Sequence, residues 1–195
     1  MIANIDNAVT NGLANGMSGL LLADWGDGGN PNPWLVSVPA IVYAAHRVRG
    51  ETLSRDQLAS EIDRLLGCKC GQAVLAFGDV YGKARGRMGN SAELFLLLEQ
   101  GGDYRRDKDV TDETLAAALE QWRMAESLFD SKGAPEWVKD DFAMLNLLYR
   151  AVEMRIREPG KKNFRAHFEP EYRKLWLKQN RIGGLSGSLV YVFGK

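Results

Sequence analysis

Neither sign of charge dominates this sequence. Its 25 lysines and arginines equal its 25 aspartates and glutamates, so the formal net charge at pH 7 is zero. A protein that binds nucleic acid usually carries a basic stripe or has a high isoelectric point, because phosphates are its main contacts. The balance of charge therefore argues against a nucleic-acid partner.

Long apolar runs are also missing. No run approaches the ~18 residues that a membrane-spanning helix needs, so we expect no membrane partner. Polar residues begin at Asn4, and no secretory signal is visible. If Met1 is the true start of the chain, the expected location is the cytoplasm.

Cysteine and histidine are scarce, which argues against disulfide cross-links between distant parts of the fold and against a zinc site. Cys68 and Cys70 lie one residue apart and cannot staple distant parts of a fold. Cys-x-Cys can contribute to a metal site, but zinc needs three or four ligands, and His46 and His167 lie far away in the sequence. We therefore expect reduced, partly buried thiols, with no metal and no cofactor.

The pattern of the chain after Gly50 is helical. Ser54 and Gln57 form a capping-box signature, and the strongest periodicity lies between Pro135 and Pro159, with apolar residues alternately four and three apart. The periodic residues are Val138, Phe142, Leu145, Tyr149, Val152 and Ile156. This spacing also occurs in coiled coils, but it continues for less than three heptads, so a core helix of a bundle is favoured.

The first fifty residues have a different pattern. Residues 3–15 show a helical period, and "GLLLAD" at 19–24 is a short apolar run of the kind found in strands that are buried on both faces. Residues 25–34 are rich in Gly, Asn and Pro and predict a loop. Residues 34–49 predict a mostly apolar helix, so the order is helix, strand, loop, helix.

A single buried strand needs neighbours on both sides, and the only other β-favouring run is at 188–193. The pattern therefore predicts a mainly α chain whose residues 1–50 are the truncated last β/α unit of a TIM-type barrel, a fold of about 250 residues when complete. Residues 51–195 would form a C-terminal α-helical bundle domain. The unpaired strand 19–24 would be exposed and would favour self-association.

Residues 19–45 resemble the last strand, loop and helix of the catalytic barrel in glycoside hydrolase family 20, the β-N-acetylhexosaminidases. The matching elements are Trp25-Gly26-Asp27, then Gly28-Gly29, then Ser37-Val38-Pro39 before an apolar helix. The segment "YRKLWLKQNRIGGLSGS" at 172–188 resembles the end of the helical domain that follows this barrel.

The resemblance implies a sugar subsite. In it, Trp25 would stack beneath the sugar ring and Asp27 would bind its outer hydroxyls, with Asp24 and Trp34 as candidates for the pocket rim. Other interpretations are that Trp25 is a packed aromatic and that Asp27 caps the helix that follows the loop. Asp24 could bond loop amides, and Trp34 could fasten the loop to the following helix. The implied partner is a carbohydrate of the N-acetylhexosamine type.

The resemblance implies no catalytic residue in this chain. The family's adjacent Asp-Glu pair would lie upstream of residue 1, and Asp140, Asp141, Glu169 and Glu171 are interpreted as solvated helix charges. We therefore expect a C-terminal fragment of a glycoside hydrolase that is inactive alone. The alternative is a stand-alone α-helical interaction module without catalysis.

Overall fold

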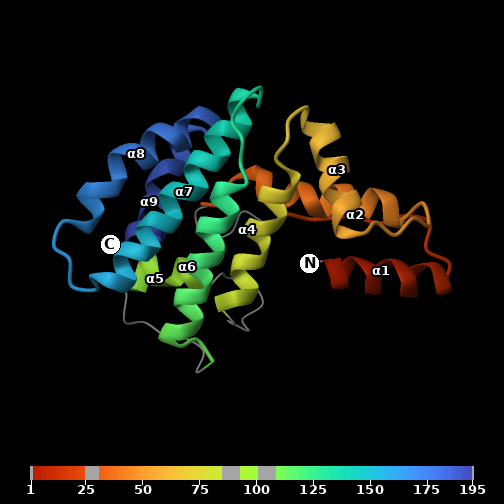
Figure 1. Ribbon diagram of the computed structural model, residues 1–195, viewed down its shortest axis with the longest axis horizontal. Helices are drawn as coiled ribbons and strands as arrows, with labels where there is room; N and C mark the ends of the chain where they lie inside the picture. The colour runs from red at the N-terminus through yellow and green to blue at the C-terminus, as the bar shows by residue number, and fades with distance from the viewer. Residues whose placement is uncertain (1, 25–30, 85–92, 101–108, 195) are drawn as a thin grey trace.

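The computed structural model describes residues 2–24, 31–84, 93–100 and 109–194, and every regular element within them is helical. In chain order the elements are α1 (Ile2–Ala14), the 3₁₀ turn η1 (Trp34–Ser37), α2 (Val38–Arg47), α3 (Arg55–Leu66), α4 (Gly71–Ala84), α5 (Glu93–Gln100), α6 (Asp112–Ser127), α7 (Glu136–Arg157), α8 (Phe164–Gln179), η2 (Ile182–Gly184) and α9 (Leu185–Phe193). Figure 1 shows α1, α2 and α3 on one side of the molecule and α5 to α9 on the other, with α4 between them. None of the helices in these ranges is long and apolar enough to cross a membrane.

The expected barrel remnant is wrong. Residues 19–24 form no strand, and no sheet exists within the described ranges. Leu21 is 92% exposed and Leu22 is 40% exposed, so this apolar run lies on the surface instead of in a core. The other β-favouring run, 188–193, belongs to α9. Because residues 19–24 are not a strand, self-association through an exposed strand at this position loses its structural basis.

The region around α1 and α2 is held by polar bonds as well as by apolar contacts. Ile5 and Val9 of α1 are buried, as their spacing indicated. Asp6 accepts a hydrogen bond of 2.8 Å from the Tyr43 hydroxyl and one of 2.7 Å from Arg47 Nε. These bonds fasten α1 to α2.

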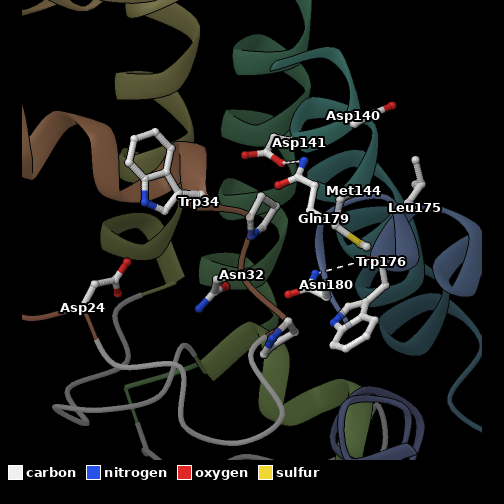
Figure 2. Close-up of a pocket in the computed structure, with 12 residues that line it drawn as sticks. Asp24, Asn32, Trp34, Asp140, Asp141, Met144, Leu175, Trp176, Gln179 and Asn180 are labelled. Carbon is white, nitrogen blue, oxygen red and sulfur yellow. Dashed lines mark hydrogen bonds between the residues drawn. The ribbon is translucent and has the colours of Figure 1, made fainter. Parts of the chain in front are cut away.

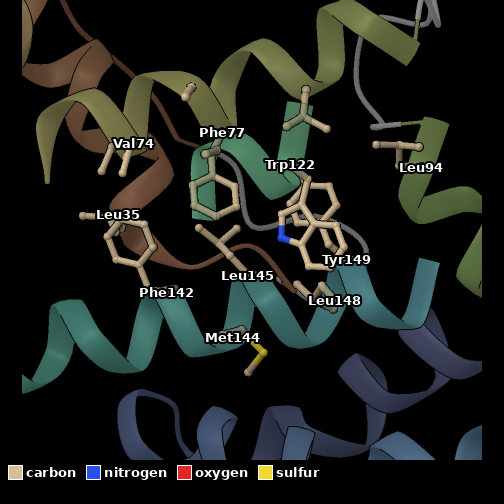
Figure 3. Close-up of a cluster of buried hydrophobic side chains, with 14 of the residues drawn as sticks. Leu35, Val74, Phe77, Leu94, Trp122, Phe142, Met144, Leu145, Leu148 and Tyr149 are labelled. Carbon is tan, nitrogen blue, oxygen red and sulfur yellow. The ribbon is translucent and has the colours of Figure 1, made fainter. Parts of the chain in front are cut away.

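The main core surrounds α7. Five of its six periodic residues are buried as predicted, and Ile156 is partly buried against the same core. Figure 3 shows several of them pointing toward α4 and α6. The Phe142 ring lies 5.5 Å from that of Phe77 and stacks on Phe129 at 3.6 Å, while Tyr149 stacks near Trp122 at 5.8 Å. Helix α7 also packs against α5 and α8. The bundle interpretation of its periodicity is therefore confirmed.

Local capping signals explain where helices α3 and α6 begin. Ser54 and Gln57 form the predicted capping box at α3, and Thr111 with Thr114 forms another at α6. Each box satisfies backbone N–H groups that the first turn of a helix leaves without partners.

A single apolar cluster includes residues from both sides of position 50. The division of the chain into 1–50 and 51–195 stays a prediction.

Candidate functional site

A cavity of about 410 Å³ lies between Asp24, residues 31–34 and helices α7 and α8 (Figure 2). Its volume is within the range that small-molecule sites usually have, ~300–1,000 Å³. Three aspartates, three side-chain amides and two tryptophans are among its lining residues. The lining consists of Asp24, Pro31, Asn32, Pro33, Trp34, Asp140, Asp141, Met144, Leu175, Trp176, Gln179 and Asn180.

One wall is shaped by the sequence Pro31-Asn32-Pro33-Trp34. Proline fixes its own φ and disfavours a helical conformation in the residue before it, so this stretch is extended until η1 begins at Trp34. Trp34 is 51% exposed, and its ring meets that of Trp137 edge-on, with centroids 5.7 Å apart. The Trp34 indole therefore lines the cavity and packs edge-on against the Trp137 indole.

Asp141 connects this wall to the helical bundle. The side chain is 2% exposed, and its carboxylate accepts a 2.8 Å hydrogen bond from the Leu35 N–H and a second one from Gln179 Nε2. Burial raises the pKa of the Asp141 carboxyl above its ordinary value, and these two hydrogen bonds partly oppose the rise. One α7 residue therefore holds both η1 and the last turn of α8.

Trp176 supplies the cavity with a hydrogen-bond donor that has no partner among the described residues. The side chain is 5% exposed, and its indole Nε1–H is buried and unpaired there. A buried indole N–H usually has a partner, because leaving it unsatisfied costs about 1–3 kcal/mol. In Figure 2 this indole lies beside Asn180, whose Nδ2 donates to the Trp176 carbonyl at 3.0 Å. An acceptor oxygen that reached this N–H would remove the penalty.

The other two carboxylates of the lining are already engaged. Asp24 accepts a hydrogen bond from the Ser37 hydroxyl, and Asp140 accepts one of 2.5 Å from Lys178 Nζ. Among the residues that the structure describes, no lysine or arginine is part of the lining, and Lys178, which precedes Gln179, is paired with Asp140. Within the described part of the chain, no three metal-ligating side chains come together.

Of the four residues expected at a sugar subsite, the structure describes two. Trp25 and Asp27 lie outside the described residues, so their expected roles stay predictions. Asp24 and Trp34 both line the cavity, and their role at the rim of a sugar subsite stays a prediction. Trp34 also contacts Trp137, which belongs to α7 and not to the helix that follows Trp34 in the chain.

The interpretation of Asp141 as a solvated helix charge is wrong, because this side chain is buried. The spacing of Asp141 in the sequence indicated its burial. It follows Val138 by three residues and precedes Leu145 by four, and therefore lies on the apolar stripe of α7. A carboxylate on such a stripe requires hydrogen-bond partners. Nothing in the sequence indicated that these partners would be Leu35 and Gln179.

Comparison with known proteins gave no match, whether to a family model, a curated protein or a solved structure. The resemblance to family 20 glycoside hydrolases therefore stays an expectation, and the cavity is interpreted from its own chemistry.

Proposed function

We propose that this chain binds a carbohydrate in the cavity between Asp24, residues 31–34 and helices α7 and α8, without hydrolysing it. The observation that carries the proposal is that two indoles line one cavity: Trp34 is exposed, and the buried Nε1 donor of Trp176 has no partner among the residues that the structure describes. On this proposal the chain is the sugar-binding accessory part of a hexosaminidase-like glycoside hydrolase.

The chemistry of the lining suits a sugar. A pyranose ring has an apolar face of C–H groups, which packs against a flat aromatic ring, and a rim of hydroxyls. Asn32 is exposed and offers an amide donor and acceptor for these hydroxyls. Gln179 is also exposed and offers its carbonyl oxygen, since its Nε2 donates to Asp141 and to the Trp137 carbonyl. Charge supports a neutral ligand, because the described lining contains three aspartates and neither lysine nor arginine.

The same lining argues against catalysis. Glycoside hydrolysis usually requires two carboxyl groups on opposite sides of the scissile bond, one of them acting as an acid. Each carboxylate of this cavity already accepts a hydrogen bond from a described neighbour, and Asp141 holds backbone at the site. We therefore expect binding without turnover.

The proposal is tested by titrating the protein with N-acetylglucosamine and its β-linked dimer while following the tryptophan indole N–H signals by NMR. The signals of Trp34 and Trp176 are expected to shift in a saturable manner. Trp122 is the internal control, because its indole donates to Asn146 Oδ1 at 3.1 Å within the core and should not shift. If neither Trp34 nor Trp176 responds up to the solubility limit of the dimer, the carbohydrate proposal fails.

A second candidate function is a helical interaction module without a sugar ligand. It is favoured by the exposed Leu21 and by an apolar groove of about 270 Å³ beside α2. The groove is lined by Leu20, Leu22, Ile41, Ala44, Ala45 and Val48. Sedimentation velocity over a concentration series tests this candidate: concentration-dependent association that Ile41→Glu abolishes and Met124→Glu leaves unchanged would favour it, and a strictly monomeric protein would count against it.

A further inference from the structure

The short turn between α3 and α4 brings the only two cysteines of the chain together. Cys68 and Cys70 are 9% and 1% exposed, and the Cys68 thiol donates to Cys70 Sγ across 3.4 Å. Lys69 lies between them and is exposed, so the turn itself is at the surface. The chain has no third cysteine that could compete for either thiol.

The fold keeps the two thiols at this separation. Gly67 ends α3 in the left-handed conformation, with φ 68°, and this turns the chain toward α4. Asp63 Oδ1 then accepts hydrogen bonds from the Cys70 N–H at 2.8 Å and the Gly71 N–H at 2.6 Å. The thiols are therefore neighbours because the backbone is held on both sides of them.

Gly71 fixes how closely α4 approaches α3. A Cβ at this position would lie 2.1 Å from the carbonyl oxygen of Ala59, which no side chain tolerates. The Gly71 backbone thus lies directly against α3, and the Cys68–Cys70 turn is packed at a helix–helix contact. Changes at the two sulfurs are expected to stay local to this turn.

We propose that Cys68 and Cys70 form a reversible dithiol–disulfide site that is oxidised by a small peroxide. In the first step Cys68 sulfur attacks one peroxide oxygen, the O–O bond breaks, and Cys68 becomes a sulfenic acid while water leaves. In the second step Cys70 sulfur attacks Cys68 sulfur, the S–O bond breaks, and the hydroxide leaves as water with the Cys70 proton. Two electrons pass from the thiol pair to the peroxide, and a dithiol reverses the change.

The order of the steps follows from burial. Cys70 is the more deeply buried of the two, and burial raises the pKa of its thiol, with the nearby Cys68 and Asp63 acting in the same direction. Cys70 therefore stays protonated at neutral pH and is poorly placed to meet an oxidant. Cys68 is the outer sulfur and reacts first, and Cys70 resolves the product.

The disulfide would not serve as a structural staple. The stabilisation by a disulfide increases with the length of the loop that it closes, and this loop contains a single intervening residue. A bond that contributes so little to folding can open and close without loss of the fold. The site is independent of the sugar cavity, which none of these residues lines.

The whole chain is treated with hydrogen peroxide, blocked with an alkylating reagent, denatured and digested with trypsin. Cleavage after Lys69 separates the cysteines into peptides 65–69 and 70–83, so a disulfide appears by mass as one linked pair that is two hydrogens lighter than the sum. Dithiothreitol should release both peptides. Two separately alkylated or separately overoxidised peptides would overturn the proposal.

The variant Cys70→Ser separates the two steps, because it lacks the resolving thiol. Peroxide in the presence of dimedone, which traps sulfenic acids, is expected to label Cys68 in this variant and to give little label in the original protein. The matched variant Cys68→Ser should give little label. Labelling confined to Cys68→Ser would contradict the assigned roles, and circular dichroism of both variants checks that the helices are retained.

Discussion

Helix α7 and residues 19–24 are both rich in large apolar side chains, yet they differ completely in burial. On α7 the apolar residues recur every three or four positions and are buried among α4, α5, α6 and α8. In residues 19–24 the three leucines are consecutive, and Leu21 is 92% exposed. Spacing places a whole stripe on one helix face, whereas consecutive leucines need not share a face: Leu20 is partly buried against the core, and Leu21 is exposed. The difference shows that pattern, more than apolar content, decides what is buried here.

The largest expected effect is at the centre of α7. Phe142 is 2% exposed and stacks on Phe129 while also meeting Phe77. Replacing it with alanine in Phe142→Ala leaves a cavity in the core and should lower the free energy of unfolding by about 3–5 kcal/mol. Equilibrium denaturation measures the loss, and a change below ~1 kcal/mol would contradict the place of α7 at the core.

The next effect concerns the residue that connects α7 to the cavity wall. Asp141→Ala leaves the Leu35 N–H and the Gln179 amide without their acceptor, and should destabilise the fold by about 1–3 kcal/mol. Asp140→Ala is the matched control on the preceding residue. It removes an ion pair with the partly exposed Lys178, which is worth at most ~1 kcal/mol. Equal losses for the two variants would contradict the special role of Asp141.

The pH dependence of stability gives a smaller signal from the same residue. Its pKa is raised in the folded protein from the ordinary value of 3.8, so between these two pKa values the folded state binds more protons than the unfolded state. The contribution of Asp141 to stability is therefore greatest at acid pH and decreases as pH rises through its folded pKa. Glu61 and Glu169 have lowered pKa values and act in the opposite direction.

Denaturation of the original protein and of Asp141→Asn over a pH series isolates this contribution, because the other groups are common to both. The stability of the original protein relative to the variant should decrease as pH rises above about 4. A relative stability that increases with pH would contradict this: it would mean that the hydrogen-bond partners of Asp141 lower the pKa of its carboxyl more than burial raises it.

The smallest effect is expected in the exposed run. Leu21→Ala removes a side chain that is 92% exposed, so the free energy of unfolding should change by no more than ~0.5 kcal/mol. The same denaturation experiment measures it beside Phe142→Ala. A loss above ~2 kcal/mol would show that Leu21 is buried and that the contrast between the two regions is incorrect.

The elements that the sequence revealed are those with a local physical cause. The capping box at Ser54 and the periodic stripe of α7 depend only on nearby residues, and both are found. The prediction of a buried strand at 19–24 was wrong because a short apolar segment has no period that distinguishes a buried strand from an exposed loop. The cavity depends on Asp24 and residues 31–34 meeting residues about 110 to 150 positions later. No local pattern contains that information, although Asp24 and Trp34 were expected at a pocket rim.

Sugar affinity measured for the original protein and for Trp34→Ala tests the account most directly. Trp34 is the exposed aromatic of the cavity, so its removal should weaken binding of the N-acetylglucosamine dimer about tenfold or more, the size of effect typical of a central aromatic contact. Met124→Ala, which changes a half-exposed side chain on α6 away from the lining, should bind as the original does. Equal affinity of all three proteins, or no binding by any of them, would contradict the assignment of the cavity as a carbohydrate site.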